Sequence, residues 1–185
     1  MPAWVQNQLV VKGPAKKISK FKKQAVGFNA WGKPTKKTKP SPLNFHSLVP
    51  IPDDVLKQEY SPVGNDWEWK NWGCKWGSCE AKLIQDSGFF ILYRFTTPWS
   101  PPDRFLKKLG VLWPDLTFVL DYIASEGDGE NLPFEIGTDK DAKLDKSKNK
   151  LLEEIFGDIT WEEHNFVRGI TKVHGNQCVY FTIDI

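Results

Sequence analysis

The segment AKLIQDSGFFILYRFTT, residues 81–97, decides how the rest of the chain is arranged. Two β-forming runs, 81–85 and 89–97, flank the sequence DSG, whose residue types favour a tight turn. The segment therefore predicts a β-hairpin. Side chains on both faces of the second run are mostly apolar, so we expect the insertion or the C-terminal strand described below to cover part of its open face.

A helix and a strand are predicted on each side of this hairpin. Before it, residues 4–12 alternate like a strand, and residues 15–26 place apolar side chains at helical spacing. After it, Pro101 and Pro102 suit the first turn of a helix, and residues 116–124 form a β-rich run. The apolar stripe of this second helix comprises Phe105, Leu106, Leu109 and Leu112. The order β-α-β-β-α-β predicts an α+β fold of the ferredoxin-like, split βαβ type, with two helices on one face of an antiparallel sheet.

Two further segments accompany this pattern. Residues 28–80 form an aromatic-rich insertion between the first helix and the second strand, and we assign residues 1–137 to one ferredoxin-like domain. The first part of the insertion, within 27–42, is rich in Gly, Pro, Lys and Thr, which predicts an exposed and mobile loop. Residues 138–185 are predicted to form a C-terminal α/β extension that packs on the same sheet.

The extension is predicted to begin with short helices and to end in a strand. Apolar residues at 151–156 and 160–167 favour two helices, and Glu163 completes a capping box at the start of the second. The run QCVYFTIDI, residues 177–185, is strongly β-forming. It predicts a strand that either extends the sheet or pairs with a strand at 132–136.

Tryptophan is concentrated in one segment. Residues 66–79, DWEWKNWGCKWGSC, hold four of the nine tryptophans in the chain. We expect Trp72 and Trp76 to anchor the insertion on the sheet as a small core. Trp31 and Trp67 are the better candidates for exposed contact, because tryptophan is among the residues that dominate binding interfaces. The sequence leaves open whether Trp67 and Trp69 are exposed. The polar candidates in this segment, which would fix the loop or meet a ligand, are Asn71 and Lys75.

Positive charge is concentrated at the start of the chain. Residues 1–52 contain ten lysines and no acidic residue, whereas residues 53–185 carry a formal charge of −8. This asymmetry is compatible with a solvated lysine surface, and also with a docking surface for phosphates or for an acidic protein. The lysines of the predicted helix and the following loop that we select as candidate binding residues are Lys16, Lys17, Lys20, Lys23, Lys36 and Lys37.

No pattern in the sequence is typical of a metal centre or an active site. Cys74 and Cys79 are separated by four residues, unlike the closer pairs of most zinc sites, and a complete site would also require Cys178 and a histidine. The phosphate-binding loop and the dinucleotide fingerprint are both missing. We therefore predict no cofactor, no metal ligand and no catalytic residue, although Lys75 beside Cys74 leaves a thiol-dependent activity open.

Four short motifs give the chain a resemblance to a known family. They are MPAWVQN at 1–7, FHSLVPIP at 45–52, NWGCKW at 71–76 and WSPP at 99–102. In this order they resemble the YubB-type ferredoxin-like domain family of phage and plasmid proteins, over residues 1–125. The chain departs from the family pattern at Cys74, where threonine is usual, and at Gly77, where Asp or Asn usually follows. The resemblance implies a ferredoxin-like fold and residence on a mobile genetic element, and it implies no catalytic residues.

These features together predict a binding protein that is not an enzyme. We expect a phage- or plasmid-encoded protein that engages a host factor, with a defence component as one candidate target. The alternative is a nucleic-acid-binding module for RNA or single-stranded DNA that uses the lysine cluster at 16–39. The chain has no apolar run near the roughly 18 residues of a membrane span and no signal-peptide pattern, and its three cysteines cannot all pair. We therefore expect the host cytoplasm and no membrane partner.

Overall fold

The computed structural model describes residues 4–125 and 166–184. Its strands are β1 (Trp4–Lys12), β2 (Cys79–Asp86), β3 (Phe90–Pro98), β4 (Thr117–Ser125), β5 (Phe166–His174) and β6 (Gln177–Asp184). Its helices are α1 (Ala15–Ala25), α2 (Phe45–Leu48), α3 (Asp53–Leu56), α4 (Pro62–Asn71) and α5 (Asp103–Leu112). The six strands of these residues form one antiparallel sheet, so the α+β class predicted from the sequence is confirmed.

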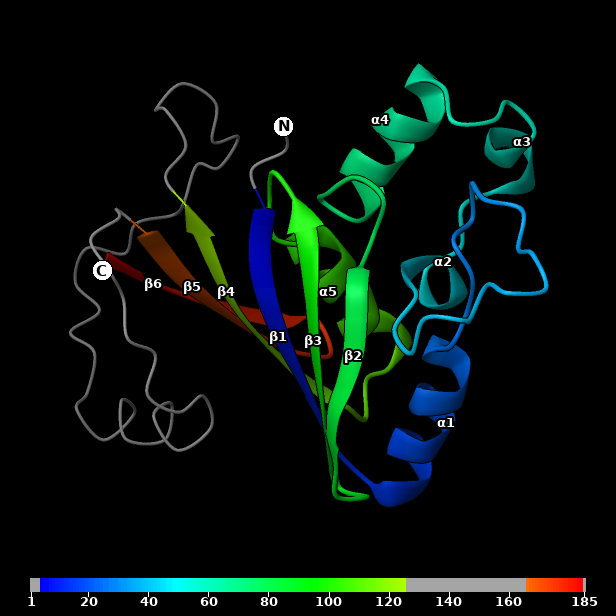
Figure 1. Cartoon of the computed structure of the whole chain (residues 1–185). Coiled ribbons are helices and arrows are strands. Elements are labelled where there is room, and N and C mark those ends of the chain that lie inside the picture. The colour runs from blue at the N-terminus through cyan, green and yellow to red at the C-terminus, as the bar shows by residue number, and fades with distance from the viewer. Residues whose placement is uncertain (1–3, 126–165, 185) are drawn as a thin grey trace.

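The sheet is built around β1. Its strand order is β2-β3-β1-β4-β5-β6, so that β1 lies between two strands that come much later in the chain. β1 pairs with β3 along its whole length, from Trp4 opposite Pro98 to Lys12 opposite Phe90. On its other side it pairs with β4. In Figure 1, α5 lies behind the central strands, and α1 and the helices of the insertion are drawn to the right of β2. The ring of Phe21 in α1 lies 5.6 Å from that of Phe118 in β4, centroid to centroid, so α1 covers a face of the sheet.

The main core lies between the sheet and the helices. Alternate residues of β1, including Leu9 and Val11, belong to the same buried cluster as Phe21 of α1. The insertion adds to this core, because Phe45 of α2 stacks on Phe105 of α5 with ring centroids 3.8 Å apart. Aromatic packing of this kind contributes beyond the area that it buries. It fixes the insertion to the same core as the sheet.

The elements predicted for the first two thirds of the chain are present. The strand at 4–12, the helix at 15–26 and the hairpin at 81–97 are confirmed, with small shifts at their ends. One core position is wrong, because Leu112 was placed in the apolar stripe of α5 but is 56% exposed. α5 ends at this residue, and its side chain lies at the rim of a groove described below.

The strands β5 and β6 form a hairpin that extends the sheet beyond β4. His174 pairs with Gln177, which leaves Gly175 and Asn176 as a two-residue turn. Gly175 has a φ of 55°, a conformation that such turns require and that glycine adopts without strain. Extension of the sheet was one of the two arrangements predicted for the C-terminal strand, but its partner is β5, which the sequence pattern did not predict.

Of the secondary structure predicted for the extension, the described residues include the end of one helix and the C-terminal strand. The helix at 160–167 is wrong at its end, because Phe166 and Val167 already belong to β5 and pair with β4. Pairing along a neighbouring strand here outweighs a local helical pattern. The strand predicted at 132–136 and the helix predicted at 151–156 lie outside the described residues.

Gly110 of α5 is predicted to be required for seating the C-terminal hairpin. A Cβ atom at this position would lie 2.3 Å from the Val173 side chain and 2.4 Å from the carbonyl oxygen of Gly175. We expect Gly110→Ala to lower the free energy of unfolding, measured by urea titration, by about 1–3 kcal/mol through overpacking, although alanine is the better helix former. Gly32→Ala is the control, because its Cβ would meet only atoms 3.9 Å or more away. Unchanged or greater stability of Gly110→Ala would show that the hairpin does not rest on α5 at this point.

Candidate functional site

A buried carboxylate, that of Glu68 in α4, lies at the centre of the insertion. α4 begins at Pro62, where the missing N–H of proline leaves no hydrogen bond unmade. Glu68 is fully buried. One of its oxygens accepts a hydrogen bond from the indole N–H of Trp31 at 2.7 Å, and the other accepts one from the backbone N–H of Trp76 at 3.0 Å. These two bonds join the loop that follows α1, the helix α4 and the loop that follows α4.

The environment of Glu68 makes it a positioning residue. Burial raises the pKa of its carboxyl group, and the hydrogen bonds from Trp76 and Trp31 oppose this rise because they stabilise the charged form. Loss of the carboxylate would leave two N–H donors without their partner, which costs more than the net value of the bonds. Glu68 therefore holds both tryptophan residues in place.

Trp31 is packed against α4 and is not the exposed contact residue that the sequence predicts. Its ring lies over Gly64, where an added Cβ would come within 2.6 Å of the indole. The ring of Tyr60 packs edge-on against it, with centroids 5.3 Å apart. Trp31 is half-buried, and its indole N–H is bonded to Glu68. The loop predicted to be mobile is thus tied to α4 at this residue.

Trp67 and Trp72 form a packed pair at the C-terminal end of α4. Trp72 is buried and donates its indole N–H to the carbonyl of Val49 at 3.1 Å, which confirms its predicted role as an anchor. Trp67, whose exposure the sequence leaves open, packs edge-on against Trp72 with centroids 5.5 Å apart and is half-buried. Asn71 donates its side-chain amide to the Trp67 carbonyl at 2.7 Å and accepts from Lys108, so it fixes the end of the helix.

Three exposed tryptophans gather at one end of the sheet. Trp76, predicted to be an anchor, is 38% exposed and packs edge-on against Trp99 with centroids 5.4 Å apart. Trp99 is 36% exposed, and the amino group of Lys75 lies over its ring at 4.8 Å. Trp4, 45% exposed, pairs in register with Pro98, the residue before Trp99. We call Trp4, Trp76, Trp99 and Lys75 the tryptophan platform, which lies where β1 begins and β3 ends (Figure 1).

A chain of buried hydrogen bonds supports this platform. Asn7 donates its side-chain amide to the Thr97 hydroxyl at 3.0 Å, and that hydroxyl donates to the Ser100 carbonyl at 2.7 Å. The Ser100 hydroxyl donates in turn to the carbonyl of Gly73. The loop after β3, which carries Trp99, is thereby tied to the loop after α4, which carries Trp76.

The exposed pair is also held in an unusual backbone conformation. Trp76 and Trp99 have φ values of 60° and 64°, in the left-handed region that bulky residues rarely adopt. Such a conformation costs on the order of 1–3 kcal/mol and persists only where the surroundings impose it. The fold therefore fixes the main chain at both tryptophans.

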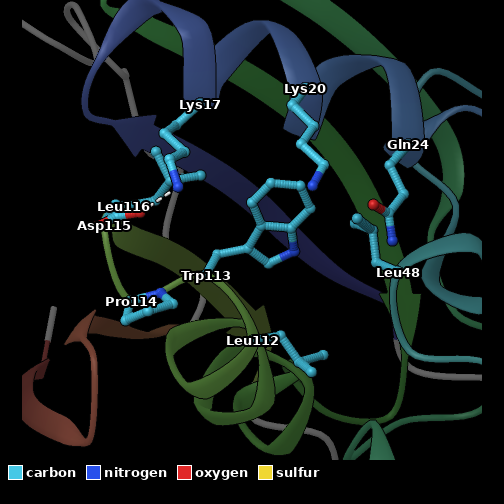
Figure 2. A pocket seen from close by; sticks show the side chains of 9 residues that line it. All are labelled: Lys17, Lys20, Gln24, Leu48, Leu112, Trp113, Pro114, Asp115 and Leu116. Carbon is cyan, nitrogen blue, oxygen red and sulfur yellow. Dashed lines mark ion pairs between the residues drawn. The ribbon is translucent and has the colours of Figure 1, made fainter.

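The lysines selected from the sequence separate into two groups. The structure brings Lys17 and Lys20 together at a groove between α1 and the end of α5 (Figure 2). Lys17 forms an ion pair with Asp115 at 2.6 Å, and the amino group of Lys20 lies over the ring of Trp113 at 5.8 Å. The other group is exposed and does not line this groove: Lys16, Lys23, Lys36 and Lys37.

Cys74, the candidate nucleophile, is fully buried. Burial raises the pKa of its thiol well above the usual value, so the reactive thiolate is strongly disfavoured. Within residues 4–125 and 166–184, no group of three or more His, Cys, Asp or Glu side chains is placed to hold a metal ion. In the same part of the chain, no helix has the length and apolar character needed to cross a bilayer.

Comparisons with known proteins give no match, whether to family models, to curated proteins or to solved structures. The candidate site is therefore defined by its own geometry. Sequence reasoning missed Glu68 and Trp113 as site residues and assigned Trp99 only to the start of a helix. Trp99 could have been found through the WSPP motif, whereas nothing local marks Glu68 as buried.

Glu68→Gln is predicted to change how stability depends on pH. Glutamine keeps the shape of the side chain but has one acceptor oxygen where the carboxylate has two. Because burial raises the pKa of Glu68, the folded chain binds this proton more tightly than the unfolded chain does. The contribution of the carboxyl group to the free energy of unfolding therefore falls as pH rises from its unfolded pKa through its higher folded pKa.

We expect the wild-type free energy of unfolding, relative to that of Glu68→Gln, to be greater at about pH 4 than at about pH 7 in urea titrations. Glu59→Gln, a substitution at an exposed position of the same insertion, controls for the change in net charge. A difference between wild type and Glu68→Gln that is constant over this range would contradict the buried, hydrogen-bonded carboxylate.

Proposed function

We propose that this protein binds another protein through the tryptophan platform, and that it is not an enzyme. The observation that carries the proposal is the pair Trp76 and Trp99, which are each more than a third exposed and yet packed edge-on against each other. Large aromatic side chains dominate binding hot spots because they bury much area. A pair that is already ordered loses little further conformational entropy on binding.

The platform also indicates the chemistry of the partner. Lys75 places a positive charge over the ring of Trp99, at the edge of the apolar surface. Exclusion of water from this region would strengthen the attraction between Lys75 and an opposite charge. We expect the partner to present an apolar side chain that packs on the tryptophans, with an adjacent carboxylate that pairs with Lys75.

We further propose a ferredoxin-like arrangement of the first four strands and a phage or plasmid origin, with a host factor as the partner and a defence component as the candidate target. The strand order β2-β3-β1-β4, with α1 after β1 and α5 after β3, supports the fold assignment. Three of the four motifs behind the family resemblance each contribute one platform tryptophan: Trp4, Trp76 and Trp99.

Replacement of the platform tryptophans is predicted to weaken partner binding without unfolding the chain. Trp76→Ala keeps the backbone N–H that bonds to Glu68, and Trp99→Ala removes a ring from the surface. We expect each substitution to raise the dissociation constant of a purified partner about 30-fold, as for a typical hot-spot residue. The candidate partners are proteins that wild type captures from a bacterial host lysate and that both variants fail to capture. The affinity of each purified candidate for wild type and for the variants is then measured by calorimetry.

Phe89→Ala is the matched control. Phe89 is 71% exposed and lies at the opposite end of β3 from Trp99, so its removal takes away exposed aromatic area without altering the platform. This variant should bind the partner with wild-type affinity, and circular dichroism should show all three variants folded. The proposal fails if purified partners bind Trp76→Ala and Trp99→Ala as tightly as wild type, or if no captured protein binds directly.

A further inference from the structure

A groove between α1 and the end of α5 combines an apolar wall with a basic rim. Its volume is about 320 Å³, at the lower end of the range for small-molecule sites. Lys17, Lys20 and Gln24 contribute the polar rim from successive turns of α1. Figure 2 shows Lys20 reaching from α1 to the ring of Trp113, Lys17 directed to Asp115, and Gln24 beside Leu48.

Trp113 is the central side chain of this groove. Its ring packs edge-on against the buried ring of Phe21, with centroids 5.3 Å apart and an interplanar angle of 78°, so the core fixes its orientation. The residue is half-buried and has the Lys20 amino group over its ring. An ordered indole beside a cation suits a ligand that joins a planar aromatic ring to a separate negatively charged group.

The exposure of Leu112 strengthens this interpretation. Leu112 lies at the end of an otherwise buried apolar stripe, yet it is more than half exposed at the rim of the groove. Together with Trp113 and Pro114, it extends the apolar surface that a ligand in the groove would cover. A contiguous apolar surface beside a concavity is typical of ligand sites.

The rim has the charge that a phosphate requires. Lys17 and its partner Asp115 are both about half exposed, at 50% and 54%, so their ion pair contributes little and can be exchanged for a ligand phosphate. Lys20 is exposed and lies one turn further along the helix. α1 carries five lysines, of which Lys17 and Lys22 pair with Asp115 and Asp86, so the surface of the helix keeps a net positive charge that attracts anions.

We propose that this groove binds a phosphorylated nucleoside. The base stacks on Trp113 in the place that the Lys20 amino group now occupies, and that amino group moves to hold the phosphate together with Lys17. The ligand is either a free nucleotide or the terminal nucleotide of a single strand, since both present the same base and phosphate. A simple anion would use the lysines but not the indole. This site is separate from the tryptophan platform, so it stands or falls independently of protein binding there.

Calorimetric titration of the full chain with adenosine 5′-monophosphate, adenosine and ribose 5-phosphate tests the proposal. We expect the monophosphate to bind more tightly than either fragment, because it alone engages both the ring and the lysines. Trp113→Leu should weaken its binding about tenfold through loss of stacking. Lys20→Gln should weaken it about tenfold through loss of a charge-assisted contact, and this exposed substitution keeps the test valid if Trp113→Leu fails to fold.

Lys23→Gln is the matched control, because it removes the same charge from the same helix at a position outside the groove. It should leave the affinity for the monophosphate close to that of wild type. The proposal is overturned if adenosine 5′-monophosphate does not bind, if ribose 5-phosphate binds equally well, or if Lys23→Gln weakens binding as much as Lys20→Gln does. The second outcome would indicate a simple anion site, and the third would indicate diffuse attraction by the lysines.

A short oligodeoxyadenylate, with and without a 5′-phosphate, identifies the source of the nucleotide. If the phosphorylated strand binds at least as tightly as the monophosphate and loses affinity in Trp113→Leu or Lys20→Gln, the ligand is a strand end. If the monophosphate binds and neither strand does, the ligand is a free nucleotide. Both results support the site.

Discussion

The buried carboxylate of Glu68 is the constraint on which the insertion depends. A carboxylate removed from water is costly unless hydrogen bonds replace its hydration. Here the donors come from two separate segments, through the indole of Trp31 and the backbone of Trp76. Burial nevertheless raises the pKa of Glu68, so desolvation outweighs what these donors return. We infer that the network contributes more to the uniqueness of the arrangement than to its stability, since any other packing of these segments would leave a buried polar group unpaired.

Glu68 accepts a hydrogen bond from the side chain of Trp31 but from the main chain of Trp76. This difference leaves the ring of Trp76 partly exposed. The carboxylate bonds the indole N–H of Trp31, so that ring is drawn onto α4 and its polar atom is satisfied inside the protein. It bonds the backbone N–H of Trp76, which fixes the position of the main chain, while the residue stays 38% exposed with its ring packed on Trp99. The bond from Ser100 to Gly73 then joins the loop of Trp99 to the same segment. Exposure of this pair is therefore a consequence of ordered packing, and preorganisation of this kind lowers the entropy that binding costs.

Local sequence patterns predict most of the strands and helices, but they do not predict how the tryptophans pack around Glu68. Helical spacing predicts an apolar face for residues 15–26, and Ile18 and Phe21 of that face are buried, because the apolar face of a helix is determined by neighbours a few positions away. The sequence pattern does not predict β5, although Gly175 and Asn176 mark a hairpin turn. The run before this turn includes Gly169, which is needed only because the Tyr122 ring packs against its backbone, a tertiary contact. The sequence pattern correctly places Trp72 in the core, but it places Trp31 at the surface and Trp76 in the core, which is the reverse of the structure, for the same reason. The positions of Trp31 and Trp76 depend on the carboxylate of Glu68, which lies 37 and 8 residues from them in the sequence. A periodic pattern within one helix or strand cannot predict such contacts.

The helix α5 lies between the two proposed binding surfaces. Its length and packing make binding at one surface independent of binding at the other. It begins at Asp103, four residues after Trp99, and ends at Leu112, beside Trp113. Its ten residues span about 15 Å, so the platform and the groove lie near opposite ends of one rigid element. Sites this far apart with no shared partner are usually independent in energy. Coupling would require α5 to move as a body against the sheet, and Gly110 leaves little room for such a shift because its backbone is packed closely against Val173 and Gly175. Close packing at this one glycine therefore favours two surfaces that can be occupied at the same time.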